Sequence, residues 1–202
     1  MLSAEDGIRT VKFARNVVDS FVKKEDMKTD PTENFFDENL GVFVTLHTYP
    51  ENQLRGCIGI PEPVMPLKKA INESGRSASR DPRFPPVSEN ELDNIIVEVT
   101  ILTKPKKIQV DNPKEYIENI KIGQDGLVIE HGPNKGLLLP QVPIEQGWDV
   151  EEFLTQICWK AWLPPDAWMD ENTSLYKFQG QIFTEVEPRG AIKEKKIDGS
   201  DS

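Results

Sequence analysis

The stretch GVFVTLHTYPENQLRGCIGI (residues 41–60) decides the fold, because it holds two β-runs, 41–48 and 54–60, joined by a short turn-like link. Two such runs around a link rich in turn-forming residues predict a β-hairpin. The second run is unusual. It contains two glycines, an arginine and one of the chain's two cysteines, although strand interiors disfavour glycine and arginine is rarely fully buried.

The two-residue period of a strand divides LRGCIGI into two faces. One face is mainly apolar and is expected in the core; it holds Leu54, Gly56, Ile58 and Ile60. The other face carries Arg55, Cys57 and Gly59. A positive charge near a thiol favours the thiolate and lowers the cysteine pKa. Glycines let a ligand or another backbone come close, so Gly56 and Gly59 are candidate ligand-binding positions.

The run NIIVEVTILT (94–103) predicts a further strand with two faces. Its aliphatic face opposes a face on which Glu98 lies at mid-strand. If the three strands share a sheet, one face gathers Arg55, Cys57, Glu98 and Thr45. The alternation places His47 on the same face, whereas its nearness to the predicted turn favours an exposed strand-end residue. A thiol beside an acid or base suits nucleophilic catalysis, which makes Cys57 and Glu98 candidate catalytic residues. The alternative is structural: Cys57 packs as a small hydrophobe, and Arg55 and Glu98 form an ion pair.

A second group of charged residues lies in GRSASRDPRF (75–84). Arg76 and Arg80 are four residues apart and would share a helical face. Together with Arg55, the candidates Arg80 and Arg83 could bind a carboxylate or phosphate, since guanidinium binds such groups bidentately. The competing interpretation is that Asp81 and an arginine fix the start of the loop.

Patterns elsewhere predict an α+β fold with a mixed, mostly antiparallel sheet and flanking helices, because strands and helices do not alternate regularly. Helices are expected over 3–24, 67–79 (interrupted by Gly75), 113–120 and 149–163, a hairpin over 125–142, and one long strand, or two broken at Gly180, over 175–187. The helical spacing around Cys158 predicts a core position. Residues 1–187 would form a single domain and 188–202 a flexible charged tail.

Composition narrows the function classes. The 202 residues carry a net charge of −10, which argues against a broad nucleic-acid surface. The chain has no apolar run of about 18 residues and no signal-peptide pattern, so we expect no membrane anchor and a cytoplasmic location with two free thiols. Neither metal-ligand spacings nor nucleotide-binding glycine motifs occur, so no metal and no cofactor is expected.

Several motifs resemble the AMMECR domain family over about residues 5–187. They are GVFVTL, LRGCIGI, SRDPRFPPVSENELDNIIVEVTIL (79–102), DGLVIEHGPNKGLLLPQV (125–142), W-x-x-x-x-FL-x-x-x-C-x-K (Trp148 to Lys160) and F-x-x-x-x-F-x-E (Phe178 to Glu185). The resemblance implies an α+β fold in two subdomains, with the LRGCIG segment lining a cleft between them. It also implies an association with a Memo-like protein and a radical S-adenosylmethionine protein. One departure is Trp162-Leu163, where the family pattern usually has Gly-Leu. A bulky indole there would alter the local packing.

Two classes of function are therefore expected. In the first, the strand lines a small-molecule or thiol-dependent enzyme site, with Cys57 as nucleophile or redox thiol, Arg55 holding a small anionic ligand, and Glu98 as base or orienting group. In the second, the protein is a non-catalytic module that docks a peptide or partner protein.

Overall fold

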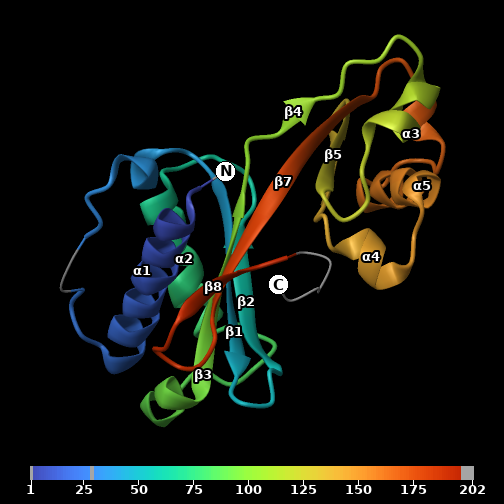
Figure 1. The fold of residues 1–202 in the computed structure, drawn as a ribbon. Coiled ribbons are helices and arrows are strands. Elements are labelled where there is room, and N and C mark those ends of the chain that lie inside the picture. Colours follow the sequence, from blue (N-terminus) through green and yellow to red (C-terminus); the bar gives the residue numbers. More distant parts are fainter. Residues whose placement is uncertain (1, 28–29, 197–202) are drawn as a thin grey trace. The chain divides into compact units, whose positions relative to one another are not determined.

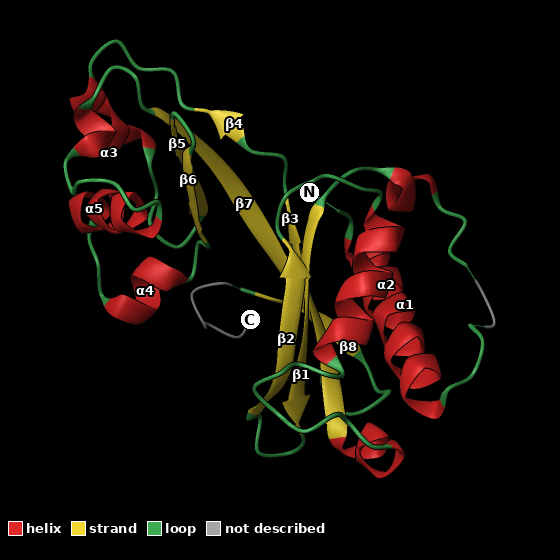
Figure 2. Cartoon of the chain, turned by 180° about the vertical axis from the view of Figure 1, so that it is seen from behind, coloured by secondary structure: helices red, strands yellow, loops and turns green. Residues whose placement is uncertain are grey.

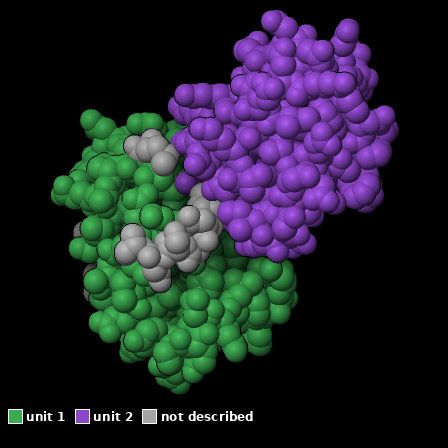
Figure 3. Space-filling model, turned by 45° about the vertical axis from the view of Figure 1, so that its right-hand side comes forward, with its two compact units in different colours: residues 1–102, 181–196, 201–202 green, residues 103–180, 197–200 purple. Residues whose placement is uncertain are grey.

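The structure is a computed structural model that describes residues 2–27 and 30–196 (Figure 1). The described chain divides into two compact units (Figure 3). Unit 1 contains the described residues up to 102 together with 181–196, and unit 2 contains residues 103–180. The chain therefore leaves unit 1, builds unit 2, and returns.

The sheet of unit 1 contains strands β1 (Gly41–Thr48), β2 (Leu54–Ile60), β3 (Ile95–Leu102), the second half of β7 (Ser174–Glu185) and β8 (Ile192–Lys195). The strand order is β2-β1-β3-β7, with β8 paired to β7. The pairs β1–β2, β1–β3 and β7–β8 are antiparallel. The hairpin predicted over 41–60 and the α+β class are both confirmed.

Two helices, α1 (Ala4–Lys23) and α2 (Leu67–Ala78), cover one face of this sheet, as Figure 2 shows. Ser3 caps α1 by accepting a hydrogen bond from the backbone N–H of Asp6, which satisfies one of the free donors at a helix start. The predicted interruption of α2 at Gly75 is wrong. The helix runs through this glycine, which lies against α1: an added Cβ would be 3.0 Å from Val17 Cγ1. Short 3-10 helices, η1 (Asn34–Asp37) and η2 (Glu89–Asn94), complete unit 1.

A buried ion pair crosses the core of unit 1. The guanidinium of Arg15, on α1, contacts the carboxylate of Glu185, at the end of β7, through two nitrogens. Arg15 also donates to the carbonyl oxygens of Leu92 (3.2 Å) and Ile95 (2.7 Å). Glu185 in turn accepts a hydrogen bond from the backbone N–H of Val97 (2.9 Å). These contacts tie α1, η2, β3 and β7 together.

Unit 2 has its own sheet and core. The sheet contains β4 (Lys106–Lys107), the first half of β7, β5 (Asp125–His131) and β6 (Asn134–Leu138). The helices of unit 2 are η3 (Pro113–Glu115), α3 (Tyr116–Asn119), α4 (Val142–Gln146), α5 (Val150–Lys160) and η4 (Ala167–Met169). The prediction of a core position for Cys158 is confirmed, since it is fully buried with its neighbours on α5. Strand β7 is continuous at Gly180.

The prediction of a flexible tail from residue 188 is wrong for its middle part. Residues Ile192–Lys195 form β8, which pairs with β7 from Ile182 to Glu185. The reason is that Ile192 packs against the core of unit 1, so one apolar residue fixes an otherwise charged segment. The remainder of the predicted tail, 197–202, lies outside the described residues.

The end of α5 explains why glycine suits the position that Trp162 occupies in this chain. This residue has a φ of 59°, and the N–H of Leu163 returns to the carbonyl of Cys158 (2.9 Å). Such a left-handed residue after a helix is most often glycine. The expectation that the indole alters packing is wrong, because its side chain is 91% exposed.

We expect Trp162→Gly to raise the free energy of unfolding by about 0.5–1 kcal/mol, because glycine adopts this conformation without the steric cost that other residues meet. The matched control, Trp159→Gly, removes the same side chain from within α5. It should lower the free energy of unfolding by about 1 kcal/mol, the cost of glycine in a helix. Urea denaturation monitored by circular dichroism compares the two. Equal losses in both variants would contradict the explanation.

Candidate functional site

A row of polar side chains crosses three strands on the sheet face opposite α1 and α2. Thr45 on β1 lies opposite Cys57 of β2 on one side and opposite Glu98 of β3 on the other. The alternate residues of β1 and β3 belong to the core beneath the helices, so these three side chains share the other face. We call Thr45, His47, Cys57, Glu98 and Lys195 the polar face. The predicted gathering of Cys57, Glu98 and Thr45 is confirmed.

Arg55 does not join this group. The register between β1 and β2 skips from Leu46–Gly56 to His47–Leu54, which leaves Arg55 as an extra residue in a bulge. Its guanidinium forms an ion pair with Glu91 (2.7 Å), and the side chain is largely buried. The bulge also shifts the alternation by one residue, so the prediction that Leu54 lies in the core is wrong: its exposed fraction is 39%.

The backbone of Cys57 is held by the loop after α2. Asp81 accepts a hydrogen bond from Cys57 N–H (2.9 Å), and Arg83 Nη2 donates to Cys57 O (3.2 Å). Asp81 and Arg83 are themselves paired at 2.6 Å. Because β2 is the edge of the sheet, this pair supplies both the acceptor and the donor that a neighbouring strand would supply. The alternative in which Asp81 and an arginine fix the loop is confirmed.

The surroundings of Cys57 favour the neutral thiol over the thiolate. Burial is the largest effect and raises the pKa of Cys57 above its usual range, although the Thr45 hydroxyl, which donates to Sγ at 3.3 Å, and the Arg83 charge lower it in part. The prediction that a neighbouring guanidinium lowers this pKa overall is therefore wrong. The guanidinium that acts on the thiol is that of Arg83, because Arg55 is engaged with Glu91.

We expect alkylation of Cys57 by iodoacetamide to be slow at neutral pH and to rise with an apparent pKa above about 8.5, the ordinary cysteine value. Cys158→Ser provides the background, since the other thiol is buried. Arg83→Gln should raise the apparent pKa further, whereas Arg55→Gln should leave it unchanged. Half-maximal reaction at pH 8 or below, or an equal effect of both arginine variants, would contradict this assignment.

Glu98 is the buried carboxylate of the polar face, with an exposed fraction of 8%. Burial raises its pKa, but the neighbouring His47 and Lys195 outweigh that effect, so the pKa of Glu98 lies below its usual range and the group is ionised at neutral pH. Lys195 Nζ is 3.3 Å from Glu98 Oε2, and His47 Nε2 is 3.8 Å from Glu98 Oε1. Strands lie about 4.8 Å apart, so the Cα atoms of Glu98 and Cys57, two strands apart, are separated by roughly 10 Å.

The imidazole of His47 has no hydrogen-bond partner within the described residues. Both ring nitrogens are shielded from solvent, and 3.8 Å to Glu98 exceeds hydrogen-bond distance. An unsatisfied buried polar group costs about 1–3 kcal/mol, so each such group in a folded protein calls for an explanation. The expectation that His47 is an exposed strand-end residue is wrong.

The other candidate ligand-binding residues have different surroundings. A Cβ on Gly56 would lie 2.2 Å from the carbonyl oxygen of Ala78, and one on Gly59 would lie 2.3 Å from the ring of Phe43. The space at both glycines is therefore filled by the protein itself, which at Gly56 is the close approach of another backbone that was expected as the alternative to a ligand. Arg80 turns to α1, where its guanidinium lies 5.2 Å from the centre of the Phe21 ring, and does not join Arg83.

Acid should weaken the attachment of the loop after α2, which holds the backbone of Cys57 through Asp81 and Arg83. The hydrogen bond from Arg83, the largest effect, holds the pKa of Asp81 well below its usual range. A carboxyl whose pKa is lowered by folding stabilises the protein above its unfolded pKa of about 3.9, and this stabilisation is lost as the pH falls through the folded value.

Asp81→Asn should therefore cost about 1–3 kcal/mol near neutral pH, because it leaves a charged hydrogen-bond network incomplete. We expect the difference between wild type and variant in the free energy of unfolding to be constant above pH 5 and to shrink below pH 4. Urea denaturation across this range measures it. Asp93→Asn is the control, since Asp93 is exposed and pairs with Arg189 at the surface. A difference that does not change with pH would contradict the prediction.

One contributor to the site, Lys195, escaped prediction. It comes from a charged segment without a clear strand pattern, and only the position of Ile192 three residues earlier could have suggested β8. For His47 the sequence left two expectations open, a place on the shared face or an exposed strand end, and the alternation along β1 was the correct signal. Among residues 2–27 and 30–196, no three or more His, Cys, Asp or Glu side chains are grouped so that they could hold a metal ion. Every helix in those residues is also too short or too polar to cross a bilayer.

Comparison with known proteins identifies the family. The model of the AMMECR1 family matches residues 11–183. Protein MJ0810 of Methanocaldococcus jannaschii is 54% identical over 198 residues, which cover 98% of each chain. Protein PH0010 of Pyrococcus horikoshii is 50% identical over 195 residues, or 93% of each chain. The crystal structure of PH0010, an uncharacterized protein, superposes with a TM-score of 0.81 at 48% identity and covers 96% of this chain and 98% of that one. The chain belongs to the AMMECR1 family.

Proposed function

We propose that the polar face of unit 1 binds a small polar molecule and that Glu98 and His47 form its acid–base pair. The observation that carries this proposal is the His47 ring, whose two nitrogens are shielded from solvent and lack hydrogen-bond partners within the described residues. An ionised carboxylate lies 3.8 Å away. Unpaired groups of this kind are expected where a ligand supplies the missing partner.

The geometry supports a separate role for each ring nitrogen. Nε2 is the nitrogen nearer to Glu98, so the carboxylate favours the tautomer that carries its proton there. Nδ1 is then left with a lone pair that can accept a proton from a bound hydroxyl or amine. A carboxylate that orients a histidine in this way stabilises the imidazolium that forms. The distance of 3.8 Å would have to shorten when a ligand binds, as catalytic hydrogen bonds often do.

Arg83 and Cys57 would complete the site without acting as base or nucleophile. The Arg83 side chain is 56% exposed, and its Nη1 makes no hydrogen bond with the described residues. It can therefore hold a small anionic ligand, the role first expected for Arg55. Cys57 would contribute a neutral thiol to the wall, since burial raises its pKa. This arrangement favours acid–base chemistry over thiol chemistry.

Ligand-observed NMR with pools of small carboxylates, amino acids and hydroxy acids tests the proposal. We expect compounds that bind wild type to lose binding in both Glu98→Gln and His47→Gln. Glu145→Gln, which removes the same charge from an exposed position in unit 2, should bind as wild type does. If no compound binds, or if every bound compound is indifferent to Glu98→Gln and His47→Gln, the proposal fails.

A docking role is the second candidate, and one observation favours it. Trp162 keeps a 91% exposed indole at a position where the helix end favours glycine, and Trp159 nearby is 54% exposed. Exposed aromatic side chains are enriched among the anchors of protein interfaces. The occupant that we propose is the Memo-like protein with which the resemblance associates this family, acting with a radical S-adenosylmethionine protein.

Size-exclusion chromatography of the two purified proteins tests this second candidate. We expect a complex with the Memo-like protein that Trp162→Ala weakens, while Trp148→Ala, at a partly buried tryptophan of the same unit, serves as the comparison. If the two proteins co-elute equally well with Trp162→Ala, Trp162 is not part of the docking surface. If they do not co-elute at all, the Memo-like protein is not the partner.

A cytoplasmic location belongs to the same proposal. Its support is that Cys57 and Cys158 are both free thiols, as is usual in a reducing compartment.

A further inference from the structure

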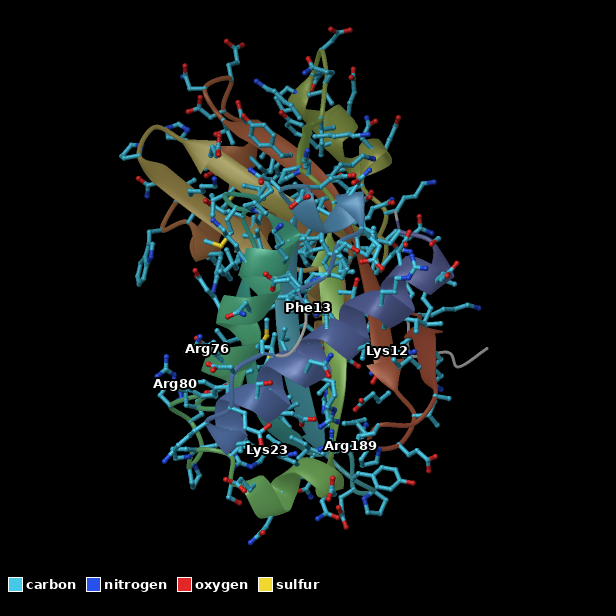
Figure 4. The ribbon with its side chains drawn as sticks, turned by 90° about the vertical axis from the view of Figure 1, so that its left-hand side faces the viewer. Lys12, Phe13, Lys23, Arg76, Arg80 and Arg189 are labelled. Carbon is cyan, nitrogen blue, oxygen red and sulfur yellow. The ribbon has the colours of Figure 1, made fainter. Side chains whose placement is uncertain are left out.

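Two arginines on the helical side of unit 1 have no carboxylate partner among the residues that the structure describes. Arg76 lies in the last turn of α2 and Arg80 lies two residues beyond the end of that helix, and Figure 4 shows the two beside one another. No carboxylate of the described residues comes within the 4.0 Å of an ion pair with either. The other arginines are all paired: Arg9, Arg15, Arg55, Arg83 and Arg189 each contact an aspartate or glutamate. In a chain with a net charge of −10, two adjacent unpaired guanidinium groups are unexpected.

One aromatic ring holds both guanidinium groups. Arg76 Cζ is 5.1 Å and Arg80 Cζ is 5.2 Å from the centre of the Phe21 ring on α1. Two neighbouring positive groups repel each other, and each cation–π contact at an exposed site offsets this by about 0.5–1 kcal/mol. The ring therefore keeps the two positive groups close to each other without neutralising either.

The two groups border a cavity that has room for a small molecule. A cavity of about 450 Å³ is lined by Asn72, Glu73, Arg76, Ser77 and Arg80. A neighbouring cavity of about 500 Å³ shares Asn72 and Arg76 and reaches Phe21; its lining also includes Lys24 and the two carboxylates of Glu25 and Asp26. The lining thus offers two guanidinium forks together with amide and hydroxyl groups. Glu73 is the single carboxylate in the first cavity, and it can accept a hydrogen bond from a hydroxyl of the same ligand.

We propose that Arg76 and Arg80 bind the phosphate group of a small phosphorylated molecule in this cavity. Two guanidinium groups match the two charges of a phosphate monoester, and each can bind its oxygens bidentately. This site lies on the exposed surface of the helical layer and is separate from the polar face, which lies on the sheet face opposite the helices. The competing explanation is that basic residues in the last turn only complement the helix dipole. That explanation requires no ligand.

Titration calorimetry with inorganic phosphate at constant ionic strength tests the site. We expect saturable binding to wild type that is about tenfold or more weaker in Arg76→Gln and in Arg80→Gln, since hydrogen bonds to charged groups are worth about 1.5–3 kcal/mol. Lys12→Gln is the matched control, because it removes one exposed positive charge from α1 and should bind as wild type does. Phosphate should also raise the melting temperature of wild type and of Lys12→Gln only.

Three results would overturn the proposal. They are an absence of saturable binding, equal weakening by Lys12→Gln, and arginine variants that lose stability while binding phosphate normally. The same titration with succinate tests whether the site prefers carboxylates. If succinate binds as tightly as phosphate, the site has no preference for phosphate. Glu98→Gln should bind phosphate as wild type does, so failure here and failure of the polar-face proposal are distinguishable.

Discussion

Arg15→Met should lower the free energy of unfolding by about 3–5 kcal/mol, because removal of one partner leaves the other charge of a buried pair uncompensated. The uncompensated group would be Glu185, whose side chain is 3% exposed. The carbonyl oxygens of Leu92 and Ile95 would lose their donors as well. Few single substitutions outside this pair are expected to cost as much.

Urea denaturation followed by circular dichroism measures this loss. Arg9→Met is the matched control on the same helix: Arg9 is 41% exposed, and exposed ion pairs contribute only about 0–1 kcal/mol. The tryptophans all lie in unit 2, so their fluorescence reports on that unit and circular dichroism on both. If Arg15→Met costs no more than Arg9→Met, the pair does not stabilise unit 1 as described.

Gly56→Ala should lower the free energy of unfolding by about 2–3 kcal/mol, the upper part of the usual cost of overpacking. The new Cβ would lie 2.2 Å from the carbonyl oxygen of Ala78. That oxygen belongs to the backbone at the end of α2, so it cannot move aside as a flexible side chain would. Either β2 or α2 must shift.

Gly75→Ala is the matched comparison, measured by the same denaturation. There the new Cβ would be 3.0 Å from a methyl group of Val17, while alanine gains about 1 kcal/mol over glycine within a helix. We expect a change within about 1 kcal/mol of zero for Gly75→Ala. If Gly56→Ala is equally mild, the glycine of the LRGCIGI strand is not needed for the approach of α2, and the role of that position must be sought in function.

The sequence predicts most of the elements of this fold, because local signals coincide with packing. The hairpin over 41–60 and the strand 95–102 follow from β-branched residues at a two-residue spacing. Their shared face is where prediction and structure agree best, since Thr45, Cys57 and Glu98 do lie in one row. Local patterns could not predict the order and register of the strands, because these depend on contacts between residues that are distant in the sequence.

The failures have physical causes that no local pattern reveals. The bulge at Arg55 moves Leu54 to the opposite face of the sheet from the one that strict alternation predicts, and the Arg55 guanidinium pairs with Glu91. Arg80 is drawn to the Phe21 ring, which belongs to a helix about 60 residues earlier in the sequence. The Cys57 pKa is decided by burial, which depends on the tertiary structure and outweighs a nearby charge.

The division of unit 1 into two sequence segments has a consequence for protein synthesis. Among the described residues, unit 2 consists of one continuous segment, 103–180, so this segment can begin to fold as soon as it leaves the ribosome. Unit 1 must wait, although most of its residues are made first, because its sheet needs the second half of β7 and all of β8. During that interval Arg15 has no Glu185 to meet. Unit 1, whose synthesis begins first, is therefore completed only when the second half of β7 and β8 have been translated.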